Sequence, residues 1–275
     1  MAKTKAFLSS LKPHSKVRMA AQAQTKLSQS HKSLWTHIFQ GTKIEQAEID
    51  EIEKDIKILD QAQRAYVGAL LFAAKQDYDS AVQMFNQALE LAPSSVMFAQ
   101  NYLMYVGISA RNHFHRMEVL RLEKHYSFPE MRRSARNLAY CVGNTKLVKK
   151  FNLKLAALEG EEEKSSILKE GERMCSIIDN FKNKSKLTSN EIEELCDEAE
   201  AIANKFGVNC IGVDYFVSNE DDSAYIIRAE TSDSAKLSEI NMELIELLST
   251  DKYINKPFTS WFRSDSTHKD KRYGS

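Results

Sequence analysis

Residues 65–93 constrain the fold of this chain more than any other stretch. Small and aromatic residues recur there at helical spacing, so two helices could approach closely while rings fill the space beside the contact. A polar break at Asp77 falls where a tight turn would join the helices, and Pro93 would end the second helix because proline donates no interior hydrogen bond. The stretch therefore predicts a helical hairpin. Its small and aromatic residues are Gly68, Ala69, Phe72, Tyr78, Ala81, Phe85 and Ala88.

This order of Ala/Gly, Tyr, Ala, Phe, Ala and Pro resembles one tetratricopeptide repeat, a helix–turn–helix unit of about 34 residues. The resemblance is clear over residues 62–93. Two further polar breaks, at Asn112 and Asn144, follow Asp77 at intervals of 35 and 32 residues, which is close to the repeat length. A single repeat cannot bury its faces alone, so its neighbours stack on it. The resemblance thus implies a superhelix of helical hairpins over residues 43–158.

The pattern changes in the last third of the chain. Helices are expected over residues 165–182 and from Thr188, which has capping-box spacing with Glu191, to Phe206. The next two segments, 208–217 and 224–231, are rich in β-branched and aromatic residues and flank a polar turn, which predicts a β-hairpin. A helix from Ser234 to Leu248 follows. The expected fold class is therefore mainly α: a TPR-like superhelix and a small C-terminal α+β domain of α-β-β-α order.

Four segments follow from these patterns. Residues 1–40 form a basic tail that ends in a short apolar helix around Leu34 and Trp35, and the part before residue 30 is expected to be mobile because it lacks a sustained apolar stripe. A helix over about 43–60 follows, with Thr42 and Glu45 at capping-box spacing. The repeat domain spans 43–158, the small domain spans 165–262, and a polar tail covers 263–275.

Composition places the chain among cytoplasmic proteins. No apolar run approaches the roughly 20 residues of a membrane span, and the N-terminus has no apolar signal region. The 4 cysteines are widely spaced, which argues against a disulfide framework or a zinc knuckle. No cofactor motif is found, so we expect no cofactor, no bound metal and no membrane partner.

The resemblance also implies where a partner would bind. Repeats of this family hold a peptide or helix of another protein in a concave groove lined by the first helix of each pair. The matching positions of the first pair and, aligned by their breaks, of the later pairs are Gln63, Tyr66, Leu70, Ala73, Asn101, Tyr105, Arg133 and Asn137. The expected function is therefore that of a non-catalytic adaptor, chaperone or regulator. The sequence leaves the oligomeric state open.

Charge is strongly segregated along the chain. Residues 111–154 carry 11 Lys/Arg against 3 acidic residues, whereas residues 159–246 carry a net charge of −13. The basic stretch, with Arg132, Arg133 and Arg136 at its centre, would suit an acidic partner protein, the chain's own acidic segment or, less well, nucleic acid.

The competing function is that of a metal-dependent nuclease or nucleic-acid effector with the C-terminal domain as its active part. Asp214 and Glu230 fall on neighbouring predicted strands and could form an acidic pair. Nucleases of this kind place a lysine two residues after the second acid, where this chain has Ser232. Solvent exposure of the hairpin explains both acids more simply. His113 and His115 are interpreted as exposed turn residues, because their separation of two does not suit one helical face.

Overall fold

A computed structural model describes residues 13–218 and 222–265, so the first 12 residues and the last 10 lie outside the described structure together with the tail predictions that concern them. The chain packs into two compact units, of which the first ends at Tyr102 and the second begins at Leu103. The boundary expected between residues 158 and 165 lies inside the second unit. No helix of the described residues is long and apolar enough to cross a membrane.

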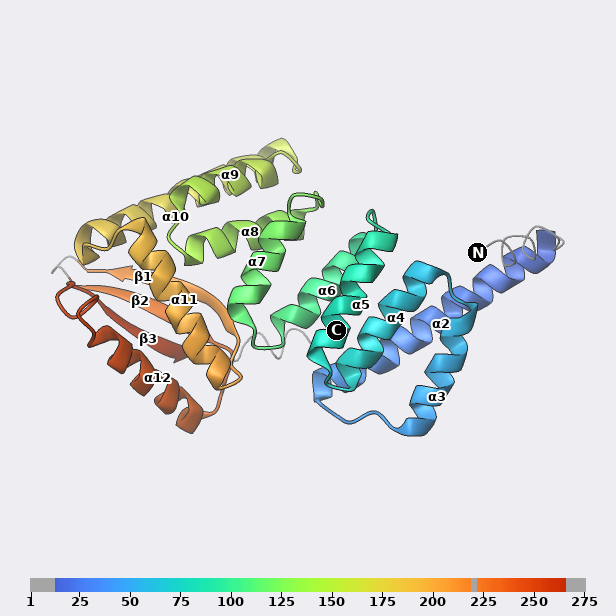
Figure 1. Ribbon diagram of the computed structural model, residues 1–275. Helices are drawn as coiled ribbons and strands as arrows, with labels where there is room; N and C mark the ends of the chain where they lie inside the picture. The colour runs from blue at the N-terminus through green and yellow to red at the C-terminus, as the bar shows by residue number, and fades with distance from the viewer. Residues whose placement is uncertain (1–12, 219–221, 266–275) are drawn as a thin grey trace. The chain divides into compact units, whose positions relative to one another are not determined.

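The first unit begins with a long helix and continues through shorter, paired ones (Figure 1). α4 and α5 form the helical hairpin that the sequence predicts, and Ala81, Phe85 and Ala88 are buried at its core. Asp77 begins α5 by accepting a hydrogen bond from the backbone N–H of Ser80. The elements are α2 (Pro13–Gln40), α3 (Gln46–Asp55), the 3-10 helix η1 (Ile56–Ile58), α4 (Gln61–Ala74), α5 (Tyr78–Leu91) and the part of α6 (Val96–Gly107) that precedes the boundary.

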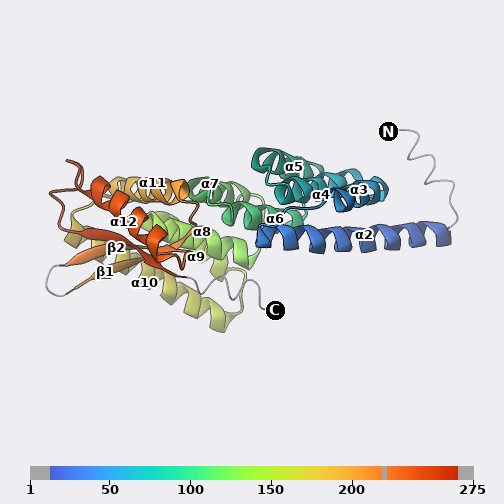
Figure 2. The same cartoon turned by 90° about the horizontal axis from the view of Figure 1, so that it is seen from below.

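The N-terminal helix corrects two sequence predictions. Residues 13–40 form one helix, α2, that packs against α4 (Figure 2), where a mobile tail and a short helix were expected. Its packed side contains the polar residues Ser30, which is buried, and His31, which is partly buried, and these interrupt the apolar pattern that the sequence analysis sought. Thr42 does not cap α3. Its hydroxyl is bonded to His37 instead, and α3 begins after Glu45.

The second unit continues the pattern of paired consecutive helices, which is consistent with helical repeats. α8 packs against α9, and α9 packs against α10. Asn144 caps α9 at the predicted break by accepting a hydrogen bond from the N–H of Leu147. The helices are α7 (Asn112–Leu122), α8 (Pro129–Cys141), α9 (Thr145–Ala156), α10 (Glu161–Ser185) and α11 (Ser189–Lys205), and the capping box predicted at Thr188 is present.

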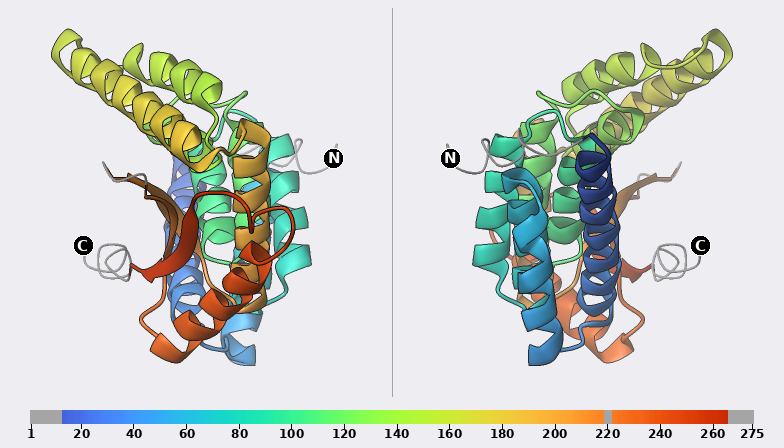
Figure 3. Two further views of the ribbon diagram at one scale, coloured as in Figure 1. Left: turned by 90° about the vertical axis from the view of Figure 1, so that its left-hand side faces the viewer. Right: turned by 90° about the vertical axis from the view of Figure 1, so that its right-hand side faces the viewer.

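A small mixed sheet completes the second unit, so the mainly α fold class with a C-terminal α+β part is confirmed. The predicted hairpin is formed by β1 (Cys210–Val217) and β2 (Ser223–Ala229), and α12 (Ser234–Leu248) follows it. The sequence analysis missed β3 (Thr259–Ser264), which pairs parallel to β2 and gives the order β1-β2-β3. This strand is short and mostly polar, and only Trp261 and Phe262 are apolar. α11 and α12 cover one face of the sheet (Figure 3).

Candidate functional site

Five of the predicted partner-binding residues lie in the first unit, where Ala73 of α4 is buried and the other four lie together. Tyr66 and Leu70 of α4 and Asn101 of α6 are buried, and Gln63 of α4 is partly exposed. The ring of Tyr66 stacks on that of Phe98, with 4.5 Å between the ring centroids. These side chains form the α4/α6 face.

The α4/α6 face is covered by the chain's own α2. The ring of His31 stacks on Tyr66 at 6.1 Å between centroids, and its Nε2 lies 3.2 Å from the side-chain oxygen of Asn101. Leu34 and Trp35, on the same side of α2, are buried as well. A helix of this chain therefore occupies the face that the sequence assigns to a partner's helix. A role in binding another protein stays a prediction.

Polar contacts fix α2 between Lys26 and His37. Lys26 pairs with Asp55 at 2.8 Å, and His37 Nε2 lies 3.0 Å from Glu48. Ser33 also donates a hydrogen bond to Glu48, and these two neighbours hold the pKa of the Glu48 carboxyl below its usual value. These contacts bind one edge of α2 to α3, while its apolar stripe is directed to α4.

α2 does not fill the α4/α6 face completely near the start of α4. A cleft of about 260 Å³ remains there, lined by Leu27 of α2, Gln63 of α4 and Met97 of α6 among others. Gln63 also forms a capping box with Asp60, so it is partly committed to starting its own helix. A small cleft thus lies beside α2 at the start of α4.

The remaining predicted partner residues lie in the second unit and differ in exposure. Tyr105 is buried, whereas Arg133 and Asn137 are exposed on α8. Asn137 borders a large cavity of this unit, and Arg133 does not.

The arginines at the centre of the basic stretch do not form one exposed surface. Arg132 is buried. Its guanidinium donates to the backbone oxygen of Glu123 at 2.9 Å and pairs with the carboxylate of the same residue. Arg136 is also buried, and it donates to Glu170 at 2.8 Å and to Asn152 at 3.1 Å. Of the three arginines, only Arg133 is exposed to solvent.

The basic stretch meets the acidic segment of the same chain within the second unit. Arg116 pairs with Glu200 at 3.1 Å and with Asp197, and Arg136 pairs with Glu170. These pairs favour the chain's own acidic segment among the three partners considered for the basic residues.

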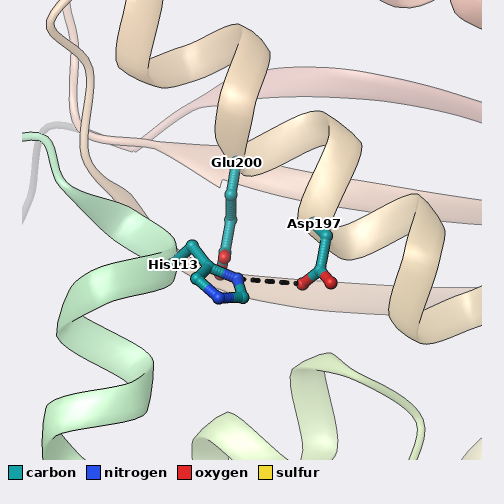
Figure 4. Close-up of side chains that lie close together, drawn as sticks. All are labelled: His113, Asp197 and Glu200. Atoms are coloured by element: carbon teal, nitrogen blue, oxygen red, sulfur yellow. Dashed lines mark hydrogen bonds and ion pairs between the residues drawn. The ribbon is translucent and has the colours of Figure 1, made fainter.

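Arg116 also contacts a cluster of His113, Asp197 and Glu200 that resembles a cation site. The side chains of His113, Asp197 and Glu200 converge, with one potential ligand atom from each lying within 4.8 Å of the others (Figure 4). The guanidinium of Arg116, however, reaches all three and lies 3.1 Å from His113 Nδ1. Burial raises the pKa of Glu200, and the charge of Arg116 opposes this rise. The cluster is therefore an ion-pair network in which Arg116 supplies the positive charge, with Glu200 buried, Asp197 partly buried and His113 exposed.

The acidic pair of the nuclease alternative is not brought together. Asp214 lies opposite Ile226 in the sheet and pairs with Arg263 at 2.7 Å. Glu230 follows the far end of β2, where it accepts a hydrogen bond from the Asn209 side chain at 2.9 Å. Asp214 thus lies in the middle of the hairpin, whereas Glu230 lies beyond the end of β2.

The second unit contains a cavity of about 720 Å³ that the sequence analysis did not find. Residues from the end of α6, from α7, α8, α10 and α11 and from both strands of the hairpin line it. Its apolar lining includes Met104, Leu138, Met174, Ile177 and Ile211, and its polar lining includes Arg173 and Arg228. These residues come from segments far apart in the sequence, so no local pattern could indicate the cavity.

Cys141, Cys196 and Cys210 also line this cavity, although their spacing in the sequence carries no motif. Burial raises the pKa of Cys141 to about 12 and those of the other two well above the usual value. Neutral thiols are weak nucleophiles, so these three cysteines are poorly suited to act as thiolates.

No protein-family model, curated protein or solved structure matches this chain.

Proposed function

We propose that this chain is a non-catalytic adaptor, chaperone or regulator of the tetratricopeptide-like kind, and that its α4/α6 face binds a helix of another protein. One observation carries the proposal: that face already holds a helix, α2, through ring stacking, apolar burial and a side-chain hydrogen bond. Recognition of a helix in a groove uses anchors at helical spacing on one side of the ligand. Leu27, His31, Leu34 and Trp35 of α2 have this spacing.

A partner's helix must then displace α2. A tethered helix acts at a high effective concentration, which lies in the millimolar range for short connections. A partner therefore binds weakly until α2 is released or until its own contacts exceed those of α2. The cysteines of the described residues are all free, which suits action in a reducing compartment such as the cytoplasm.

The exchange can be tested with one variant that releases α2. Leu34→Asp places a charge at a fully buried position, whereas Thr36→Asp places the same charge on the exposed side of the same helix. We expect a fluorescent peptide of residues 24–40 to bind Leu34→Asp at least about tenfold more tightly than Thr36→Asp or wild type. Circular dichroism confirms that each variant retains its helices, and a peptide carrying Leu34→Asp serves as the inactive ligand.

Capture from a cell lysate then tests the partner. Proteins that are retained by immobilised Leu34→Asp, are absent from Thr36→Asp and are eluted by the peptide support the proposed function. The proposal fails if the peptide binds the folded variants equally, or if it elutes no retained protein.

A further inference from the structure

We infer that the cavity of the second unit binds a small molecule with an anionic head and an apolar body, and that Arg173 and Arg228 hold its carboxylate or phosphate group. The cavity measures about 720 Å³. Small-molecule sites usually measure about 300–1,000 Å³ and combine a mostly apolar lining with a few placed polar groups. The inference concerns a different site from the α4/α6 face and does not depend on it.

The position of Arg228 is the first observation behind the inference. It lies opposite Gly212 in the hairpin, where an added Cβ would be only 2.3 Å from one guanidinium nitrogen. Gly212 also has a φ of 152°, which a side chain rarely adopts. A glycine at this point therefore lets the guanidinium of Arg228 lie across β1 at the edge of the cavity.

Arg228 has unused capacity to donate hydrogen bonds. Its Nε is buried and has no hydrogen-bond partner among the described residues. Its Nη1 has only a long contact, 3.5 Å, with the carboxylate of Asp265. Buried donors are rarely left unpaired in folded proteins, and a planar guanidinium matches a carboxylate or phosphate through two parallel hydrogen bonds. A bound anion would satisfy this group.

The charge balance of the lining is the second observation. The lining acids are each paired with an arginine outside the lining. Arg173 of α10, in contrast, forms no ion pair within the described part of the chain. The surplus charge at the cavity is therefore positive. The pairs are Glu170–Arg136 at 2.8 Å, Glu200–Arg116 at 3.1 Å and Asp214–Arg263 at 2.7 Å.

Tyr140 lines the same cavity as the two arginines. Burial raises the pKa of its hydroxyl to about 12, and the charges of Arg173 and Arg228 both oppose this rise. The three side chains line one cavity, although the two arginines come from a helix and from a strand. Two cations and a phenol beside one cavity form a head-group site.

The apolar lining specifies the rest of the ligand. Met104 and Met174 are flexible side chains that adapt to irregular shapes, and Leu138, Ile177 and Ile211 add branched surfaces. The acids of the lining are already neutralised, so they repel an anion less than their number indicates. An alkyl chain or an apolar ring suits this space better than a sugar.

Calorimetry on the full chain tests the inference with three probes of equal chain length. Decanoate and decyl phosphate carry the two candidate head groups, and decyltrimethylammonium carries the opposite charge. We expect at least one anion to bind wild type below about 1 mM, and the cation to bind at least about tenfold more weakly. The preferred anion distinguishes a carboxylate ligand from a phosphate ligand.

Variants locate the head-group site. Arg173→Gln/Arg228→Gln should lose at least about tenfold in affinity for the preferred anion. Lys169→Gln removes one positive charge from an exposed position of α10 outside the lining and should bind as wild type does. Thermal unfolding of each variant checks that it remains folded.

Thiol labelling gives a second readout that does not depend on these variants. Mass spectrometry of wild type labelled with a small alkylating reagent should show that the preferred anion slows modification of Cys141, Cys196 and Cys210. Cys175, which does not line the cavity, should react at an unchanged rate. The inference is overturned if neither anion binds, if the double variant binds as well as wild type, or if all four thiols respond alike.

Discussion

Glu191 shows how a single side chain links two distant elements of the second unit. Its carboxylate accepts a hydrogen bond from the N–H of Thr188 in the capping box of α11 and pairs with Lys256 at 2.8 Å. Lys256, whose ammonium also donates to the backbone oxygen of Lys186, follows α12 in the chain. The carboxylate therefore fixes the start of α11 to the segment that leads into β3.

This arrangement predicts a pH dependence of stability. The pair with Lys256 and the hydrogen bonds of Thr188 lower the pKa of Glu191 from 4.5 to about 2. Because the pKa is lower in the folded than in the unfolded chain, the stabilisation is complete above about pH 4.5 and is lost as pH falls towards 2. Glu191→Gln should therefore have a lower melting temperature than wild type at pH 7, and the difference should shrink progressively below pH 4.5. A difference independent of pH would contradict the assigned cause.

At the scale of elements, α9 and α10 approach closely because Gly171 lacks a side chain. An added Cβ would lie 2.1 Å from the side-chain nitrogen of Asn152. That amide donates to the backbone oxygen of Ile167 at 2.8 Å and accepts from Arg136 at 3.1 Å, so it cannot move without losing both hydrogen bonds. The contact between the two helices therefore depends on a glycine in a helix interior, where alanine is intrinsically better.

Gly171→Ala should destabilise the chain by about 1–3 kcal/mol, since overpacking exceeds the gain in helix propensity. The double variant Asn152→Ala/Gly171→Ala removes the obstructing amide and should lose less than the sum of the two single variants. Urea unfolding of the three variants measures this coupling. Additive losses would show that the two residues do not compete for the same space.

The elements that the sequence predicted are those with local signals. The hairpin of α4 and α5 has a small and aromatic pattern within one stretch, and the capping box at Thr188 spans only four residues. α2 was predicted only at its end because His31 looks polar in isolation, and the residue that accommodates it, Asn101, is 70 positions away. β3 was missed for a similar reason, since its polar alternation gains meaning only beside β2.

The candidate sites also differ in whether a local sequence pattern indicates them. Tyr66 and Leu70 came from the repeat pattern, which placed them on one side of α4 but could not indicate that α2 covers them. No local sequence pattern indicated the cavity, because Arg173 and Arg228 come to line the same space only after α10 packs beside the sheet. Arg132 and Arg136 show the opposite case, because both belong to a conspicuous run of charges and yet are buried against acids of the same unit.

At the scale of the whole molecule, a net charge of zero reflects segments of opposite sign that meet within the chain. Arg116 and Glu200, at 3% and 6% exposure, are the most deeply buried of these contacts. Removing one member leaves a buried charge without its partner, whereas removing both does not.

Arg116→Met should therefore destabilise the chain by about 3–5 kcal/mol, and Arg116→Met/Glu200→Gln should recover part of that loss. Added salt should change the effect of Arg116→Met little, because buried pairs are weakly screened. Urea unfolding at low and high salt checks both expectations. A loss below about 1 kcal/mol would mean that water reaches the pair.

The covering of the α4/α6 face has a consequence for the solubility of the chain. Contiguous apolar surfaces on isolated proteins promote aggregation, and a face built to hold a helix is such a surface when empty. With Leu34 and Trp35 of α2 seated on it, the face is shielded from water without any other molecule. Under the proposed function the chain could accumulate ahead of its partner and remain in solution, and its tendency to aggregate would become a measure of how often α2 leaves.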